Sequence, residues 1–294
     1  MSAANASLLD LLKSWLLALL PPHLLSGAVR RATRWKLPFW KNPLMRLFIW
    51  HFRVDMAEAA RPDYRDYPDF NSFFTRALQP GSRPPPADNR AIASPVDGCV
   101  SAAGVISRGR LFQAKGRDYS LTTLLGGGDE RAARFIDGNF ATLYLSPRDY
   151  HRIHMPADGQ LLETIYIPGR LYSVAPHTTR AIPGLFTRNE RLVTLFDTAA
   201  GPMAVVLVGA IFVSCMETVW AGVVNPQQGK SIVTGQFGQP GTAPLELQRG
   251  AEMGRFNMGS TVILLYGHGR IEWAKSLTAG APVRVGQTIG TMHH

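Results

Sequence analysis

Four residues in three separate segments have side chains that could perform nucleophilic and acid–base chemistry. Ser260 follows Gly259 and opens an apolar run. Asp97 lies in a turn bounded by proline and glycine, and the histidines of 150–159 are His151 and His154. A serine hydroxyl is a weak nucleophile until a base accepts its proton, and a carboxylate can orient the imidazole that serves as this base. The residue types therefore allow a nucleophile–base–orienter set, as in a serine hydrolase.

The residue types alone leave ordinary alternatives open. A lone Gly-Ser pair is most often part of a loop without chemistry, and Ser260 has no GxSxG around it. The two histidines lack the glutamate of the HExxH zinc motif. Cys99 and Cys215 are far apart and neither belongs to a CxxC pair. We therefore expect no metal site and no disulfide framework.

Two further polar features have both a structural and a functional interpretation. Arg76 follows two phenylalanines and a threonine, and it could meet either a phosphate or a structural carboxylate. The run Asn189-Glu190-Arg191 could form a fixed polar cluster near a pocket, but a turn or a salt bridge explains it equally well.

The residue pattern of the chain changes at about residue 66, where short apolar runs begin to alternate with glycine, proline and aspartate. The runs are rich in β-branched and aromatic residues and have the length of buried strands. They cover residues 141–146, 163–168, 192–196, 203–214, 218–224 and 260–266. We therefore predict an α+β fold, with a mainly β sandwich or distorted barrel as the catalytic domain (66–294) after an N-terminal helical region (1–65).

The N-terminal region contains three predicted helices, at residues 8–20, 23–36 and 43–60. The apolar run at 8–20 is interrupted by Asp10 and Lys13, so it is shorter than the roughly 20 residues that a spanning helix needs. No basic segment precedes it, and a cleaved signal peptide is not expected. The third helix carries an apolar stripe, which is more often core than function. Its members are Leu44, Leu47, Phe48, His51 and Val54.

Positive charge is concentrated in the same N-terminal region. The net charge is +10, and residues 1–53 hold eight lysines and arginines against one acid. Four of the six tryptophans lie there too, which distinguishes a membrane interface from a nucleic-acid surface. No helix-turn-helix, zinc-finger or RNP motif is present. We therefore expect an acidic membrane as the partner and no nucleic acid.

Several motifs together resemble one enzyme family. The string GAEMGRFNMGSTVILLY (250–266) is similar to the C-terminal signature of phosphatidylserine decarboxylases, whose cleavage motif is usually LGST. Further matches follow in the family's order over about residues 66–290. They are FNSFFTRALQPGSRP (70–84), SPVDG (94–98), KGRDYSLTTLL (115–125), YHRIHMPADG (150–159), LFTRNERLV (185–193) and VGA (208–210).

The resemblance implies a proenzyme that cuts itself between Gly259 and Ser260. The Ser260 hydroxyl would attack the preceding carbonyl and convert the amide into an ester. The family pattern gives His154 the role of base and Asp97 that of its orienting carboxylate. β-Elimination would then release a β chain (1–259) and an α chain (260–294), with residue 260 converted into a pyruvoyl group.

The same resemblance implies the reaction of the mature enzyme. The pyruvoyl group is the covalent cofactor, and it would form a Schiff base with the amine of phosphatidylserine. This linkage accepts the electrons left when CO2 departs. His151 is the candidate proton donor, although it could instead pack or bind the substrate carboxylate. The product would be phosphatidylethanolamine, as made by a carboxy-lyase of phospholipid biosynthesis.

The resemblance and the charge pattern together predict partners and location. We expect a heterodimer of the chain's own α and β chains, which could pair into a homodimer, at the cytoplasmic side of the cell membrane as a peripheral protein. Two alternatives stay open: a pyruvoyl-dependent decarboxylase of a soluble amino acid, and an uncleaved membrane-binding module.

Overall fold

The structure is a computed structural model that describes residues 27, 29, 31–114, 116–210, 215–224, 230–239, 243–257 and 260–293. Most of the regular structure there is β, which confirms the mainly β prediction. The predicted helix at 8–20 lies outside the described residues, as do residues 23–26, 28 and 30 of the one at 23–36, and Gly259.

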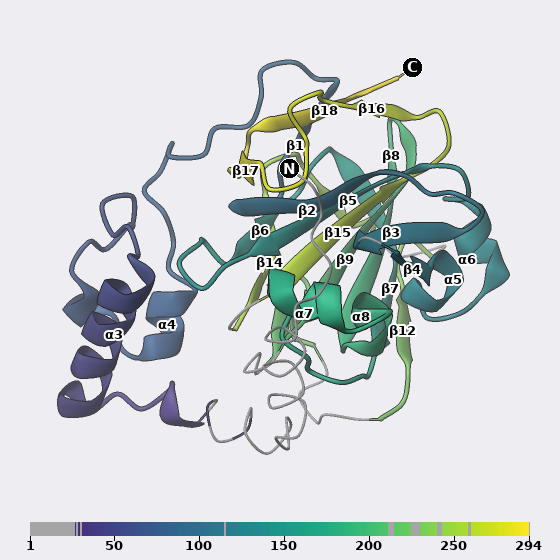
Figure 1. Cartoon of the computed structure of the whole chain (residues 1–294). Coiled ribbons are helices and arrows are strands. Elements are labelled where there is room, and N and C mark those ends of the chain that lie inside the picture. Colours follow the sequence, from purple (N-terminus) through teal and green to yellow (C-terminus); the bar gives the residue numbers. More distant parts are fainter. Residues whose placement is uncertain are drawn as a thin grey trace.

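One large antiparallel sheet forms the centre of the molecule (Figure 1). In spatial order its strands are β12 (Val233–Gln236), β7 (Gly159–Ile167), β8 (Arg191–Thr198), β9 (Gly201–Gly209), β15 (Ser260–Tyr266), β5 (Asn139–Leu145), β2 (Gly98–Val105) and β17 (Pro282–Val283). A further strand, β13 (Glu246–Leu247), also pairs with β7. The strand that begins with Ser260 therefore lies in the middle of the sheet.

Two smaller sheets and a hairpin complete the β structure. The four-stranded sheet runs β11 (Gly222–Val223), β10 (Met216–Thr218), β14 (Glu252–Phe256) and β6 (Arg152–His154). The three-stranded sheet runs β1 (Ala91–Ala93), β18 (Thr288–Met292) and β16 (Ile271–Trp273). The hairpin pairs β3 (Arg110–Ala114) with β4 (Arg117–Ser120).

The architecture is layered rather than closed. Within the described residues, the end strands β12 and β17 of the large sheet pair with a single neighbour each, so a closed barrel is wrong. Both smaller sheets pack on one face of the large sheet, where they share an apolar core with Val262, Leu264 and Tyr266 of β15. Ile263 and Leu265 point into a second core on the opposite face.

Short helices and the β3–β4 hairpin cover the second face of the large sheet. The helices are α5 (Leu121–Leu124), α6 (Asp129–Ala133), α7 (Pro176–Ala181) and α8 (Leu185–Arg188). Because both faces of β15 are covered, all seven of its residues are buried. A central strand of this kind is read in the sequence as one continuous apolar run.

The helix α3 (Pro38–Phe52) replaces the predicted helix at 43–60. It begins earlier because Pro38 occupies the first turn, where a missing N–H costs nothing. It ends earlier because Arg53 adopts a left-handed conformation with φ 55°. Leu44 and Phe48 of the predicted stripe pack inward, whereas Leu47 is 59% exposed.

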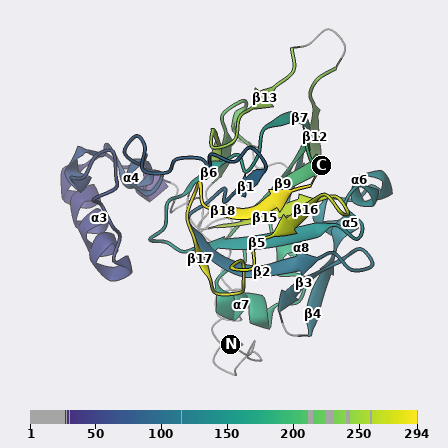
Figure 2. The same cartoon turned by 90° about the horizontal axis from the view of Figure 1, so that it is seen from above.

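A single turn of 3-10 helix, η1 (Tyr64–Asp66), and the helix α4 (Phe70–Phe74) follow α3. Phe70, Phe73 and Phe74 of α4 pack with Met45 and Phe48 of α3 in a third apolar cluster. Figures 1 and 2 show this helical unit standing at one side of the sheets. It contacts them through α4, because the Phe74 ring lies 4.1 Å from the ring of His151.

No helix within the described ranges has the length and apolar character needed to cross a bilayer. The helical unit nevertheless exposes large apolar side chains. They are Trp35, Leu37, Phe39, Trp40, Leu47 and Trp50.

Candidate active site

Ser260 is the first residue of β15 and lies between two paired strands. Its partners across the sheet are Gly209 of β9 and Leu145 of β5. The side chain is fully buried, and its Oγ atom has no hydrogen-bond partner. Buried hydroxyl groups are usually satisfied, because an unpaired one costs about 1–3 kcal/mol. The sheet thus fixes the serine rigidly while leaving its reactive atom free.

The segment that leads to Ser260 is held by Asn257. Its Nδ2 donates to Glu217 Oε1 at 2.8 Å, and its backbone N–H donates to the Cys215 carbonyl at 3.1 Å. Its Oδ1 accepts from Asn71 Nδ2 at 2.9 Å, so α4 also contributes to the anchor. These bonds fix the chain three residues before Ser260.

His154 lies on β6 and has both ring nitrogens in contact with hydrogen-bond partners. Nδ1 is 2.7 Å from the Gly250 carbonyl, which can only accept, so Nδ1 carries the proton. Nε2 then accepts from the Tyr150 hydroxyl at 3.0 Å. Burial lowers the pKa of His154. The ring is therefore neutral at pH 7, with its basic lone pair on Nε2.

Asp97 is bound by an arginine rather than by a histidine. Its two carboxylate oxygens accept from Arg83, at 3.1 Å from Nε and 2.7 Å from Nη2, and Oδ1 also accepts from the Val285 N–H at 2.8 Å. Among the described residues no hydrogen bond joins Asp97 to His154. The two segments do touch, because the His154 N–H donates to the carbonyl of Pro95 at 2.9 Å.

His151 is fully buried directly beneath α4. Its Nδ1 donates to the Asp149 carbonyl at 2.8 Å, whereas Nε2 is buried without a partner. Burial lowers its pKa to about 3, and the nearby Arg76 acts in the same direction. His151 is therefore a neutral imidazole with a free lone pair. To donate a proton it must first gain one at Nε2, which a bound carboxylate beside the ring would favour.

The four predicted residues converge on one end of the large sheet. The loop that carries His151 leaves β5 directly after Leu145, the residue opposite Ser260. The His151 carbonyl accepts from the Phe256 N–H at 3.1 Å, which joins this loop to the strand before the serine. Ser260 Oγ and His151 Nε2 are both buried without a partner at this end of the sheet.

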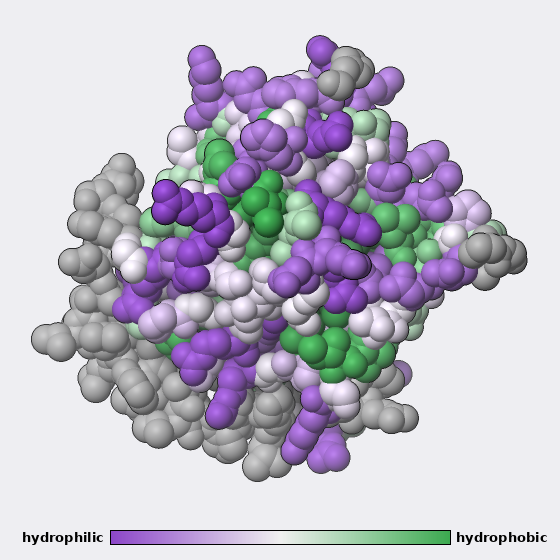
Figure 3. Space-filling model, turned by 90° about the vertical axis from the view of Figure 1, so that its right-hand side faces the viewer, coloured by the Kyte–Doolittle hydropathy of each residue, from purple (hydrophilic) through white to green (hydrophobic). Residues whose placement is uncertain are grey.

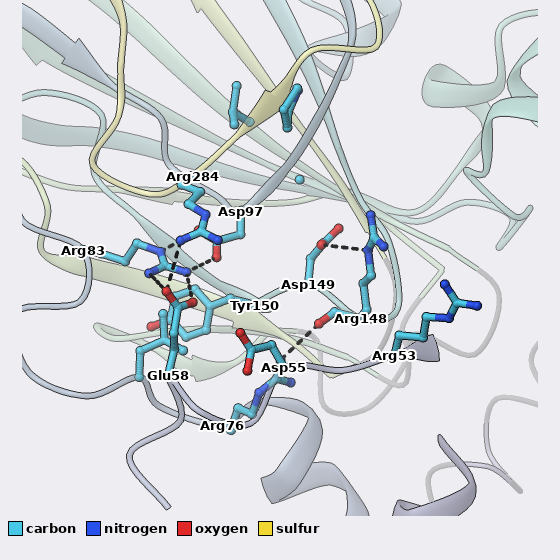
Figure 4. A pocket seen from close by; sticks show the side chains of 14 residues that line it. Arg53, Asp55, Glu58, Arg76, Arg83, Asp97, Arg148, Asp149, Tyr150 and Arg284 are labelled. Carbon is cyan, nitrogen blue, oxygen red and sulfur yellow. Dashed lines mark hydrogen bonds and ion pairs between the residues drawn. The ribbon is translucent and has the colours of Figure 1, made fainter. Parts of the chain in front are cut away.

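A charged cavity of about 310 Å³ opens beside Asp97 (Figure 4). Figure 4 shows Arg83 between Asp97 and Glu58, with Arg284 above the same carboxylates. Arg83 Nη2 is 2.7 Å from both Asp97 Oδ2 and Glu58 Oε2, and Arg284 Nη1 is 3.1 Å from Glu58 Oε1. Of the predicted site residues, Asp97 lines this cavity.

Sequence reasoning missed three contributors to the site. Tyr150 hydrogen-bonds His154, Gly250 supplies the carbonyl that sets its tautomer, and Arg83 neutralises Asp97. Tyr150 stands four residues before His154, a spacing that could have indicated it. Gly250 and Arg83 come from distant segments, and the sequence contains no local signal for either contact.

Comparisons with known proteins show which family the chain resembles over its length. A family model described as phosphatidylserine decarboxylase matches residues 70–291, and a model described as PSD matches residues 12–53. A phosphatidylserine decarboxylase proenzyme from Ectopseudomonas mendocina is 52% identical over 272 residues, which cover 92% of this chain and 95% of the relative. One from Bordetella avium is 50% identical over 271 residues, covering 92% and 91%.

The similarity extends through both the helical unit and the sheets, and the relatives are proenzymes by name. The chain therefore belongs to the phosphatidylserine decarboxylase family, and it is a self-processing, pyruvoyl-dependent member of that family.

Proposed function

We propose that this protein converts phosphatidylserine to phosphatidylethanolamine and CO2 with a pyruvoyl group made from Ser260. The observation that carries the proposal is the Ser260 hydroxyl, buried without a partner at the start of the central strand. A fixed, unpaired hydroxyl after a glycine suits attack on the preceding carbonyl. The neighbouring His151 offers a second free polar atom on the same end of the sheet.

For self-cleavage, His154 acts as the base that accepts the Ser260 proton. Its neutral ring and its Nδ1 bond to Gly250 support this role, because the lone pair on Nε2 is available once Tyr150 turns away. Burial lowers the pKa of His154, and the negative charge of Asp97 acts against this by favouring the protonated ring. Arg83 holds the carboxylate in place during this step.

The two products of cleavage stay together as a heterodimer. The α chain (260–294) contributes β15, β16, β17 and β18. β15 is paired on both sides by β5 and β9, and β18 is paired with β1. Strands of the two chains are therefore interleaved in two sheets, and separation would expose the apolar core.

In the mature enzyme, the pyruvoyl group supplies an electron sink for decarboxylation. The buried position of residue 260 keeps water from the reacting carbon. His151 accepts a proton at Nε2 and then donates it to the carbon that loses CO2. The Phe74 ring and the Asp149 carbonyl fix the imidazole for this transfer.

The helical unit holds the enzyme on the cytoplasmic side of an acidic membrane. Phe39 and Trp50 are 76% and 75% exposed on α3. Within four residues of them in the chain are three exposed basic residues, Lys36, Arg46 and Arg53. Each such basic residue contributes about 1 kcal/mol at an acidic lipid surface. The face that looks away from this unit is mostly hydrophilic with separate apolar patches (Figure 3).

The substitution Ser260→Ala tests the proposed function. We expect an intact chain on a denaturing gel, no carbonyl that borohydride or hydrazine can trap, and no CO2 release from phosphatidylserine vesicles. The unsubstituted protein should show two chains and one trapped carbonyl on the smaller chain. An active, uncut Ser260→Ala protein would contradict the proposal.

The same assay separates the alternatives. A decarboxylase of a soluble amino acid would be cut but would release CO2 from free serine or another amino acid rather than from vesicles. A membrane-binding module would bind vesicles as a single uncut chain.

A further inference from the structure

One carboxylate shares the strand row of Ser260 without a role in the steps above. Ser260 pairs with Gly209 across β15 and β9. The Gly209 N–H donates to the carbonyl of Glu190 at 2.9 Å, next to the pairing of Val208 with Arg191. Ser260, Gly209 and Glu190 thus lie in one row, with roughly 10 Å between the outer Cα atoms.

The two outer side chains of this row lie on the same face of the sheet. Residues directly opposite each other in an antiparallel sheet point to the same side. Val262 and Leu192, each two residues further along their strands, both belong to the core between the sheets. The Glu190 carboxyl group hydrogen-bonds Tyr166, which packs in that core as well. Gly209 has no side chain, so nothing from the middle strand separates Ser260 from Glu190.

Glu190 differs from the carboxylates of the charged cavity. Asp97 and Glu58 are paired with Arg83, whereas no described lysine or arginine forms an ion pair with Glu190. The side chain is partly buried, and burial raises its pKa even though the Tyr166 hydrogen bond lowers it. Burial therefore makes this carboxyl group a better proton acceptor than an exposed glutamate.

A cavity on this face is lined by the hydrogen-bond partner of the Glu190 carboxyl group. Tyr166 and Leu192 also line a mainly apolar cavity of about 490 Å³, together with Trp220 and Phe237. Tyr166 therefore connects this cavity to the Glu190 carboxyl group.

The reaction needs a base at this position. The head-group amine arrives as an ammonium ion, which cannot attack a ketone until it loses a proton. The other candidate bases are engaged or weak: His151 has a pKa of about 3, Asp97 is held by Arg83, and His154 Nε2 accepts from the Tyr150 hydroxyl. Glu190 is the carboxylate of the Ser260 row, and no described lysine or arginine forms an ion pair with it.

Building on the proposed function, we propose that Glu190 binds the head-group ammonium ion and transfers its protons during attachment to the cofactor. The carboxylate takes one proton from the ammonium nitrogen, whose freed electron pair forms a bond to the keto carbon. The C=O π electrons move to oxygen, and the oxygen receives that proton from the Glu190 carboxyl group. A second nitrogen proton follows by the same route, and the oxygen leaves as water while a C=N bond forms. Glu190 ends as it began.

The substitution Glu190→Gln tests this role, because glutamine keeps the shape and the contact with Tyr166 but cannot exchange protons. The readout is amine capture, measured by mass spectrometry as the adduct that borohydride traps between the α chain and short-chain phosphatidylserine. At pH 7 we expect normal self-cleavage and a capture rate about 100-fold lower than in the unsubstituted protein. Raising the pH should restore capture, because free amine then comes from solution.

Three further variants make the test specific. Glu246→Gln changes an exposed glutamate on β13 and should leave capture unchanged. Glu190→Asp keeps a carboxylate and should recover part of the rate at pH 7. Tyr166→Phe removes a bond that lowers the Glu190 pKa, so the pH dependence of capture should shift to higher pH.

The outcomes separate the two proposals. If the unsubstituted protein traps no amine, the proposed function fails. If it does trap amine and Glu190→Gln captures at the same rate with the same pH profile, the role of Glu190 is wrong. The role is also wrong if Glu190→Gln is uncut while Glu190→Asp is cut with an unchanged capture profile, because the carboxylate would then serve maturation.

Discussion

The region around Ser260 and His151 and the cavity around Asp97 differ in whether their polar groups have partners. Ser260 Oγ and His151 Nε2 are buried and have no partner. In the cavity, by contrast, Arg83 joins Asp97 to Glu58, and Arg284 adds a further contact to Glu58. The first region contains reactive atoms without a partner, whereas the Asp97 and Glu58 carboxylates of the second are both paired with arginine.

This difference separates chemical roles from positioning roles. An unpaired buried group lowers stability, so a fold retains it where the free atom has a use. A partly buried ion pair fixes geometry and resists change in either partner. We therefore assign the chemistry to Ser260 and His151, and the alignment of the His154 segment to the cavity. Substitutions in the two regions should differ in what they damage.

The largest expected effect is on turnover, from His151→Ala. The variant should cut itself normally, because His154 rather than His151 is the base for cleavage. Its rate of CO2 release should fall by about 1,000-fold, within the range for loss of an acid–base group. The measurements are chain separation on a denaturing gel and CO2 release per trapped carbonyl. His268→Ala removes an exposed histidine and is the matched control.

Normal turnover per trapped carbonyl in His151→Ala would end the donor role of this residue. A variant that cannot cut itself would move His151 from decarboxylation to maturation. Either result would also weaken the comparison, because the unpaired Nε2 would then lack the use assigned to it.

The next effect is on stability, from Arg83→Gln in the cavity. The side chain is 9% exposed, and its removal leaves Asp97 and Glu58 without their shared cation. Breaking such a pair costs about 3 kcal/mol. Urea unfolding of the cut protein at pH 7 should show a lower midpoint with an unchanged slope. Exposed ion pairs contribute only about 0.5 kcal/mol. A loss of stability no larger than that in Arg83→Gln would show that water solvates the charges of the cavity.

Acid should distinguish the two regions by the pH at which each loses stability. The folded-state pKa of His151 is lowered from 6.5 to about 3 by burial, so its contribution is complete above pH 6.5 and is lost as pH falls. The loss is about 1.4 kcal/mol per pH unit. The Arg83 hydrogen bond lowers the pKa of Glu58 below 4.5, so that contribution is lost only at lower pH.

Urea unfolding at pH 7, 6 and 5 measures the upper part of this dependence. His151→Ala should have a shallower slope between pH 6.5 and 4.5, whereas Glu58→Gln should match the unsubstituted protein there. Some slope should persist in His151→Ala, because burial lowers the pKa of His154 as well. Identical slopes in all three proteins would mean that His151 is not buried as a neutral ring.

The sequence predicted the strands better than it predicted the helices. The run at 260–266 matches β15 because a strand covered on both faces is apolar at every position. The helix predicted at 43–60 began too late because Pro43, a residue that normally breaks helices, lies inside α3. It ended too late because nothing in the local pattern marks the left-handed Arg53.

The sequence allows individual site residues to be proposed, but not the contacts that they make. The family motifs indicated Ser260, His154 and Asp97, yet they gave no sign that Asp97 would bind Arg83. The row that brings Glu190 towards Ser260 depends on the register of three strands. Register is set by packing over the whole sheet, so local spacing cannot supply it.

The smallest expected effect comes from Arg284→Gln, which is the matched control for Arg83→Gln. Both substitutions remove a guanidinium group from Glu58, but Arg284 is 65% exposed and does not pair with Asp97. An exposed ion pair contributes less than about 0.5 kcal/mol. The difference between the two variants in urea unfolding therefore isolates burial and the Asp97 contact. Equal losses would mean that Glu58 alone accounts for the cavity, and Asp97 would no longer be positioned by Arg83.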